Sequence, residues 1–303
     1  MDQTLALGSS RHPAPSAVLE LLKPITWFAP MWAYACGLVS SGVPLTSRVP
    51  EILVGIILAG PLLCGTSQAV NDWYDRHVDA INEPNRPIPS GRIPGQWGLY
   101  IALIGSALAL AVAAALGPWV FWAALAGMVL AWMYSAPPFR LKGNGWWGNA
   151  SVAVSYEGLA WIAGAAVMSA AMPDWRIFAL AALYSAGCHG IMTLNDFKAV
   201  EGDIKMGVRS LPVQLGVGPA ARLACVVMIV PQLVVIGLLI SWDRLLYGGA
   251  VAGLTLMQMG FMVRLLSDPR GLAPLYNATG ITAYVLGMMV SAFAVRSLIG
   301  GGA

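Results

Sequence analysis

Charged side chains are scarce in this chain of 303 residues. Asp, Glu, Lys and Arg make up only 10% of it, whereas soluble domains carry roughly 25%. Hydrophobic residues make up 58%. This balance excludes an ordinary soluble domain and predicts a polytopic membrane protein. The net charge of +3 is too small to indicate a nucleic-acid partner, and we expect none.

Cysteine is also rare, with four residues and no CxxC pair. All four lie in apolar stretches, which favours packing roles over a disulfide or zinc framework. They are Cys36, Cys64, Cys188 and Cys225. Residues 1–23 lack both the apolar core of a secretory signal and the arginine content of a transit peptide. We expect them to form a cytoplasmic tail with a short interfacial helix over residues 16–22.

Long apolar segments fill most of the remaining chain. Nine of them are about as long as the ~20 residues that a helix needs to cross a ~30 Å hydrocarbon core. They cover residues 24–44, 50–70, 97–116, 118–136, 149–170, 175–194, 219–241, 244–264 and 273–299. Lipid offers no partner to an unpaired strand edge, so these segments should all be helices. The sequence therefore predicts an all-α fold with nine transmembrane helices in one domain over 24–299.

Lysine and arginine are divided unevenly between the two sides of these segments. Thirteen of the 17 lie in the N-terminal tail and in the links after the second, fourth, sixth and eighth segments, and four lie on the other side. The positive-inside rule then places the N-terminus and these links in the cytoplasm. Two of these links, over residues 71–96 and 195–218, are long. Long polar links on one side of a bundle commonly carry the function.

The first long link opens with a regular series of acidic residues. Asp72, Asp75 and Asp79 follow Asn71 at spacings that place them on one face of a helix. Like charges at these spacings repel one another, so a cation is expected among them. Carboxylate oxygens suit Mg²⁺, which proteins bind through one or two carboxylates plus substrate phosphates. The alternative is a solvated acidic helix end without a ligand.

The second long link repeats this order. Asn195 and Asp196 end an apolar segment, and Asp203 follows Asp196 by seven residues, which is the spacing between Asp72 and Asp79. This similarity predicts a duplicated four-helix unit with one acidic cluster in each half.

Basic residues accompany both acidic clusters. Arginine and lysine suit phosphate oxygens. The candidates for binding a diphosphate are Arg86, Arg92, Arg140, Lys142, Lys198, Lys205 and Arg209. Two facing carboxylate clusters suit Mg²⁺ ions around one diphosphate, whose departure leaves a carbocation behind. An allylic chain would stabilise that cation and would lie among the helices.

Three stretches carry a resemblance to a known family. They are Asn71–Ile93, Tyr134–Gly143 and His189–Pro212. The Asn-Asp-x-x-Asp-x-x-x-Asp pattern, with a second Asp-rich motif, resembles the UbiA superfamily of intramembrane prenyltransferases. The runs Glu83–Gly91 and Thr193–Asp203 are similar to those of its chlorophyll and bacteriochlorophyll synthases. The resemblance extends from about Leu21 to Arg296.

The resemblance implies nine helices around a central cavity that the two motif links cover. It implies Mg²⁺-dependent transfer of a geranylgeranyl or phytyl group from its diphosphate to the propionate of bacteriochlorophyllide a. Chlorophyllide is the alternative acceptor, and the inner membrane of a bacterium is the expected location. The resemblance assigns catalysis to the five aspartates, and metal binding to all the matching positions: Asn71, Asp72, Asp75, Asp79, Asn195, Asp196 and Asp203. Lys198 stands where many members carry further acidic residues, so it is also a candidate for direct contact with the diphosphate.

Three further residues are candidates for the acceptor pocket. Glu157 is the one carboxylate well inside a predicted span, where an ionisable group usually faces a cavity or a partner. His189 suits the central Mg of a tetrapyrrole or a hydrogen bond to its propionate. Tyr134 suits a place beside the diphosphate or a contact of its ring face with the cation. A structural role is the alternative for each.

Two other functions fit parts of the pattern. A quinone-ring or haem prenyltransferase would use the same chemistry on another acceptor, but the two runs quoted above disfavour it. A cation transporter would carry acidic residues near the middle of several spans, whereas here they gather on one side beside basic residues. A propionate acceptor is already ionised near neutral pH, so we expect no catalytic triad.

Overall fold

The computed structural model describes residues 12–300, and this part of the chain is helical without any strand. Eight helical stretches within it are long and apolar enough to span a membrane. They run over Val49–Asn82, Trp97–Leu116 (α5), Pro118–Ser135 (α6), Gly145–Ser169, Trp175–Lys198, Val217–Ser241 (α12), Leu245–Leu265 (α13) and Pro269–Ile299 (α14). The all-α membrane fold is thereby confirmed.

The predicted count of nine spans is not reached by helix length. The first predicted span, 24–44, contains the short 3₁₀-helix η1 (Pro24–Thr26) and then α2 (Phe28–Ser40). Because α2 has 13 residues, it is only about 20 Å long. The predicted interfacial helix exists as α1 (Pro15–Leu21).

The helix of the second predicted span continues beyond residue 70, as the spacing of Asp72, Asp75 and Asp79 predicted. The chain forms α3 (Val49–Ile57), the π-helical segment η3 (Leu58–Cys64) and α4 (Gly65–Asn82) without a break. The sequence turns polar at Asn71 but has no proline or glycine until Pro84. The loss of hydropathy marks the limit of the apolar region, and the helix continues beyond it. The other seven predicted spans agree with the observed helices within a few residues.

Two long helical stretches are interrupted by π-helical turns. In the first, η3 contains Pro61, which lacks a backbone N–H. The second stretch consists of α7 (Gly145–Ala153), the π-helical segment η5 (Val154–Leu159) and α8 (Ala160–Ser169). Such turns are rare and often occur at functional sites. Both segments lie beside the cavity described below.

Glycines bring α2 and α8 into direct backbone contact. A Cβ atom at Gly37 would lie 2.0 Å from the carbonyl oxygen of Trp161, and one at Gly164 would lie 2.1 Å from that of Tyr34. Such close approaches are how helices pack in membranes, where small residues let backbones touch. The position of α2 on α8 is therefore tightly fixed.

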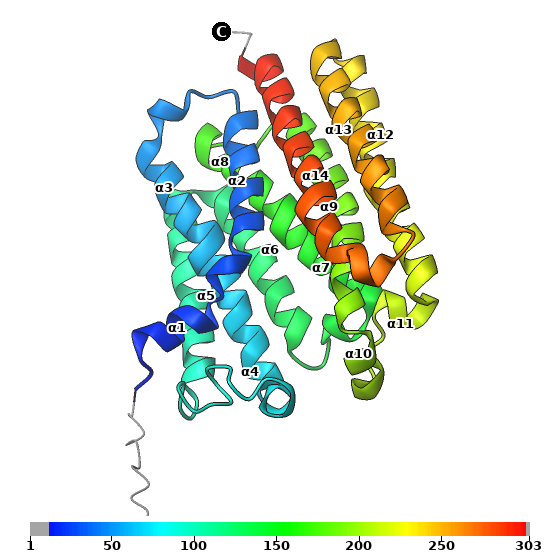
Figure 1. The fold of residues 1–303 in the computed structure, drawn as a ribbon. Helices are drawn as coiled ribbons and strands as arrows, with labels where there is room; N and C mark the ends of the chain where they lie inside the picture. Colours follow the sequence, from blue (N-terminus) through cyan, green and yellow to red (C-terminus); the bar gives the residue numbers. More distant parts are fainter. Residues whose placement is uncertain (1–11, 301–303) are drawn as a thin grey trace, which may run out of the picture.

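The two long links lie at the same end of the bundle (Figure 1). At this end α4 finishes, α9 (Trp175–Asn195) leads into η6 (Asp196–Lys198), and the chain continues through α10 (Val200–Met206) and α11 (Leu211–Leu215). The second long link also contacts the short link between α6 and α7: the amide of Gly145 donates to the carbonyl of Arg209, and the amide of Arg209 donates to that of Gly143. The proposed duplication of a four-helix unit stays a prediction.

Candidate active site

The four residues of the first motif lie on α4, as the spacing predicted. Asp72 is only 1% exposed, Asp79 is buried, and Asp75 is partly buried. Asn71 donates from Nδ2 to Oγ of Ser135 on α6, at 3.3 Å. Three buried or half-buried carboxylates on one helix face need cationic partners.

Two basic residues approach Asp72 and Asp79. Lys23 Nζ lies 2.7 Å from Asp72 Oδ1. Arg86 Nη1 lies 2.8 Å from Asp79 Oδ2 and 3.5 Å from Asp72 Oδ1. The same guanidinium donates from Nε to Glu83, at 2.7 Å. One arginine therefore joins three carboxylates of the first link.

Asp75 has basic partners from the link between α6 and α7. Lys142 Nζ lies 2.5 Å from Asp75 Oδ2, and Arg140 Nη2 lies 3.6 Å from Asp75 Oδ1. Burial lowers the pKa of Lys142, and the neighbouring Asp75 carboxylate opposes this shift. A poorly solvated ammonium of this kind would gain from a further anion.

The second motif is held by neutral groups. Asn149 on α7 donates from Nδ2 to Oδ2 of Asp196, at 3.2 Å. Ser210 donates to Oδ2 of Asp203, at 2.6 Å. Burial raises the pKa of Asp203, and the Ser210 hydrogen bond opposes that shift. Within residues 12–300 neither aspartate forms an ion pair closer than 4.0 Å, and Lys198 lies within electrostatic range of Asp196.

A cavity of about 340 Å³ joins the two motifs. Asn71 and Asn195 both line it, and so does Tyr134. The Tyr134 hydroxyl lies within electrostatic range of Asp75, Asp196 and Asp203. The structure thus brings the two links, 124 positions apart in the sequence, to one mouth.

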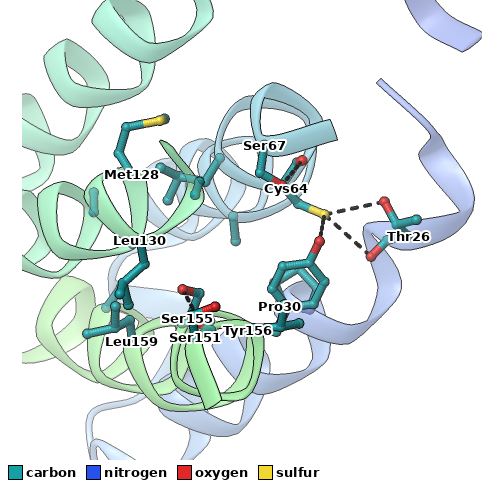
Figure 2. A pocket seen from close by; sticks show the side chains of 18 of the residues that line it. Thr26, Pro30, Cys64, Ser67, Met128, Leu130, Ser151, Ser155, Tyr156 and Leu159 are labelled. Atoms are coloured by element: carbon teal, nitrogen blue, oxygen red, sulfur yellow. Dashed lines mark hydrogen bonds between the residues drawn. The ribbon is translucent and has the colours of Figure 1, made fainter. Parts of the chain in front are cut away.

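The rest of the cavity is mostly apolar. Leucine, alanine, glycine and methionine side chains from η3, α6 and α8 line its body. Figure 2 shows the polar exception, a chain of contacts from Thr26 through Cys64 to the Tyr156 hydroxyl. Gln68 Nε2 also donates to this hydroxyl, at 3.0 Å. The volume is at the lower end of the ~300–1,000 Å³ of ligand pockets.

The donor atoms at the mouth fit Mg²⁺. They are carboxylate and amide oxygens, which a hard cation prefers. Within residues 12–300, Asp72 Oδ2 and Asn277 Oδ1 are buried without a hydrogen-bond partner. No three acidic, histidine or cysteine side chains in the described part of the chain converge on one point.

Comparison with known proteins gives the family. The sequence pattern of the UbiA prenyltransferase family matches residues 24–295. The chain belongs to this family. It is 57% identical to the bacteriochlorophyll synthase 33 kDa chain of Cereibacter sphaeroides, over 98% of this chain and 99% of that protein. It is 41% identical to the chloroplastic chlorophyll synthase of Oryza sativa subsp. japonica, over 91% of this chain and 76% of that protein.

A solved UbiA structure has the same fold. It is the UbiA homolog from Archaeoglobus fulgidus bound to GPP and Mg²⁺, with a TM-score of 0.72. The match covers 90% of this chain and 99% of that one, at 20% sequence identity.

Only part of the predicted basic set reaches the acidic clusters of this UbiA protein. Arg86, Lys142 and, less closely, Arg140 do so. Arg92 instead pairs with Glu20, with Nη2 2.8 Å from Oε1, on the exposed side of the link. Its assignment to the diphosphate site is therefore not supported. Lys198 lies within electrostatic range of Asp196. The remaining three are exposed and form no ion pair within residues 12–300: Lys198, Lys205 and Arg209.

The three acceptor-pocket candidates do not share one cavity. Tyr134 lines the cavity, but Glu157 and His189 do not. Glu157 is 4% exposed and faces Cys188 on α9, whereas the preceding Tyr156 lines the cavity. His189 lies in a separate groove beside Trp146 and Trp147, with Nε2 3.2 Å from the Trp146 carbonyl.

Several contacts at the mouth were missed by sequence reasoning. Lys23, just before the first predicted span, was not among the diphosphate-binding candidates. Asn149 stood at the edge of a predicted span, where its amide could have been recognised as a polar exception. Asn277 on α14 donates from Nδ2 to Oδ1 of Asn195, at 3.2 Å. Its amide also stands as a polar residue within an apolar predicted span. The ion pair of Arg270 with Glu201 at 2.6 Å had no signal in the sequence.

Proposed function

We propose that this UbiA-family protein esterifies the propionate of bacteriochlorophyllide a with a geranylgeranyl or phytyl group and releases diphosphate. The observation that carries the proposal is the cavity, with both motif asparagines at its mouth and an apolar body behind them. Full-length similarity to a bacteriochlorophyll synthase supports the tetrapyrrole acceptor. The apolar body suits a prenyl chain, and the charged mouth suits its diphosphate.

The basic residues at the mouth would bind the diphosphate oxygens. Lys23, Arg86 and Lys142 now pair with carboxylates of the first motif. Phosphate oxygens are strong acceptors for such groups. We propose that these three side chains contact the diphosphate and remain within reach of their aspartates.

The aspartates and asparagines of both motifs are the proposed metal ligands. They are Asn71, Asp72, Asp75, Asp79, Asn195, Asp196 and Asp203. When bound there, Mg²⁺ would neutralise the diphosphate and make it a better leaving group. Asn149 and Ser210 would hold Asp196 and Asp203 in place.

Esterification then needs one bond exchange. The allylic C–O bond breaks, and its electron pair leaves with the diphosphate. A propionate oxygen forms the new C–O bond to the same carbon. The apolar cavity keeps water from that carbon, and the ring of Tyr134 at the mouth is placed to stabilise positive charge. The propionate arrives ionised, so no base is required.

The macrocycle would contact the protein through the groove around His189. A carbonyl oxygen only accepts, so the contact with Trp146 places a proton on Nε2 and leaves the lone pair on Nδ1. Histidines that bind metals commonly donate their other N–H to a carbonyl in this way. We infer a contact between His189 and the macrocycle, and a structural role for Glu157.

The distribution of basic residues supports a cytoplasmic position for the mouth. Thirteen of the 17 lysines and arginines belong to this side by the predicted topology. The positive-inside rule and the bacterial relative support insertion in the inner membrane of a bacterium.

The test is ester formation by membranes that contain the protein. Bacteriochlorophyllide a and geranylgeranyl diphosphate would be supplied with and without Mg²⁺, and pigments would be separated by chromatography. We expect a metal-dependent ester that Asp72→Ala abolishes and Glu20→Gln, at an exposed ion pair, retains. If only chlorophyllide is esterified, the acceptor assignment is wrong. If neither tetrapyrrole reacts, a quinone-ring acceptor takes its place.

A further inference from the structure

The cavity has a closed end opposite its mouth. Along α6 its lining runs from Tyr134 to Ala123, and along α7–α8 it runs from Ser151 to Ala163. At ~1.5 Å per helical residue, the α6 stretch is about 16 Å long. The next helical turns beyond this end are filled by buried side chains that do not line the cavity: Leu38, Val120, Ala166 and Val167.

Tyr34 lies across this closed end. It comes from α2, lines the cavity and is only 1% exposed. Its hydroxyl lies against Gly55 on α3, where an added Cβ would be 1.8 Å from the oxygen. Its carbonyl oxygen lies against Gly164, the neighbour of the lining residue Ala163. At the depth where the lining ends, the Tyr34 side chain therefore contacts α3 and the Tyr34 backbone contacts α8.

Both ends of Tyr34 are fixed by backbone contacts. The contact with Gly164 leaves no room for α2 to move toward α8. The contact with Gly55 leaves no room for the hydroxyl to move toward α3. The Tyr34 ring therefore cannot make room for a longer ligand by moving toward α3.

The hydroxyl of Tyr34 is buried and has no hydrogen-bond partner among residues 12–300. A buried hydroxyl without a partner costs free energy, which a phenylalanine at this position would avoid. What the oxygen contributes here is length, because it closes the space between the ring and Gly55. This observation points to a steric role at the end of the cavity.

We propose that Tyr34 is the floor of the prenyl-chain cavity and sets the longest chain that the enzyme accepts. The proposal rests on the proposed function, because it takes a prenyl diphosphate as the ligand. With the diphosphate at the mouth, the last isoprene unit of the chain meets the Tyr34 ring. A chain with one more unit would have to displace that ring.

The experiment measures chain-length preference in two ways. Purified protein would be titrated with non-hydrolysable thiolodiphosphates of three, four and five isoprene units. Membranes would also receive the three natural diphosphates together with bacteriochlorophyllide a, and the esters would be identified by mass. The variants are Tyr34→Ala, Tyr34→Phe and Gly55→Ala, and the matched control is Leu159→Ala on a side wall of the cavity.

We expect Tyr34→Ala to raise the ratio of five-unit to four-unit ligand by at least about tenfold, since small changes of pocket volume discriminate by ~10–200-fold. Gly55→Ala should shift preference toward three units, because its methyl group pushes the ring into the cavity. Leu159→Ala should keep the wild-type ratio within about threefold, and Tyr34→Phe, which loses only the oxygen, should raise the ratio less than Tyr34→Ala does.

Any other result contradicts either the floor proposal, the proposed acceptor or the proposed ligand. If folded Tyr34→Ala keeps the wild-type ratio, the floor is elsewhere. If Tyr34→Ala does not fold, Gly55→Ala and Ala123→Leu decide, and the proposal fails unless one of them shifts preference toward three units. If ligand binding depends on chain length but no pigment ester forms, the proposed acceptor is wrong and the proposal for Tyr34 is retained. If no prenyl thiolodiphosphate binds, the floor proposal falls together with the proposed ligand.

Discussion

Lys23 Nζ lies 2.7 Å from Oδ1 of Asp72, and this contact joins the residue before η1 to the first carboxylate of α4. Lys23 has a left-handed backbone with φ of 47°, which few non-glycine residues adopt. The bend turns the chain at the mouth and directs the ammonium to a carboxylate that is almost fully buried. The N-terminal segment thereby contributes a charge to the active site.

Replacement of Lys23 should weaken prenyl diphosphate binding. In Lys23→Met, Asp72 keeps only the longer contact with Arg86. Charge-assisted hydrogen bonds contribute about 1.5–3 kcal/mol, so we expect kcat/KM for the prenyl diphosphate to fall by roughly 10- to 100-fold. Steady-state kinetics at saturating Mg²⁺ would measure this. Lys205→Met, at an exposed lysine without an ion pair, is the control and should stay close to wild type.

Two arginines of the first link should behave in opposite ways. Arg86→Gln removes the cation shared by Asp72, Asp79 and Glu83, and we expect activity to fall by about 100-fold or more. Arg92→Gln breaks only an exposed pair with Glu20, and activity should stay within about twofold of wild type. Parallel assays of the two variants make the comparison. Equal losses would show that Arg92 reaches the diphosphate.

The Ser210 hydroxyl should set the acidic limit of activity. Burial raises the pKa of Asp203, and the Ser210 hydrogen bond opposes that rise. Ser210→Ala should therefore raise this pKa further, so that the carboxylate is protonated, and activity lost, at a higher pH than in wild type. A pH–rate profile at saturating Mg²⁺ measures the shift. Ser267→Ala, at an exposed serine outside the site, should leave the profile unchanged.

The Asp203 carboxyl also contributes to the way in which folding stability changes with pH. The folded-state pKa of Asp203 lies above its unfolded value, so the folded state binds the proton more tightly. This contribution favours folding at pH values below the unfolded pKa and is lost as pH rises through the folded pKa. Thermal unfolding of Asp203→Asn should show less of this pH dependence than wild type does.

Glu157 should be dispensable for catalysis. It is buried away from the cavity, so Glu157→Gln, which keeps the size and one carbonyl acceptor, should change kcat and KM by less than about threefold. Tyr156→Phe is the informative partner, because its hydroxyl lines the cavity and accepts from Gln68. A large loss in Glu157→Gln with normal folding would restore the acceptor role that the sequence predicted.

The sequence predicted the acidic clusters well because their spacing is a local property. Asp72, Asp75 and Asp79 share a helix face by their register alone, and hydropathy located seven of the spans. It failed at the end of α4, where the chain leaves the apolar region but remains helical to Asn82. Hydropathy reports the surroundings of a segment, whereas a helix ends where capping groups, glycine or proline end it.

The contacts that individual side chains make were harder to predict from the sequence. Arg86 and Arg92 stand six positions apart in one polar link, yet one meets three carboxylates and the other meets Glu20. The difference depends on how the link folds back over α4, which no periodicity encodes. Glu157 was assigned to the acceptor pocket because a carboxylate inside a membrane span usually faces a cavity or a partner, and the side chain that it faces is that of Cys188 on α9.

The π-turn over Val154–Leu159 has a consequence for how such enzymes diverge. Its wider turn accommodates one residue more than an α-helical turn would, and the helices before and after it stay packed in the bundle. Loss of a single residue there would give a continuous α-helix and turn a different side chain toward the cavity. Relatives could therefore exchange pocket chemistry through one-codon deletions or insertions while every other helix contact is retained.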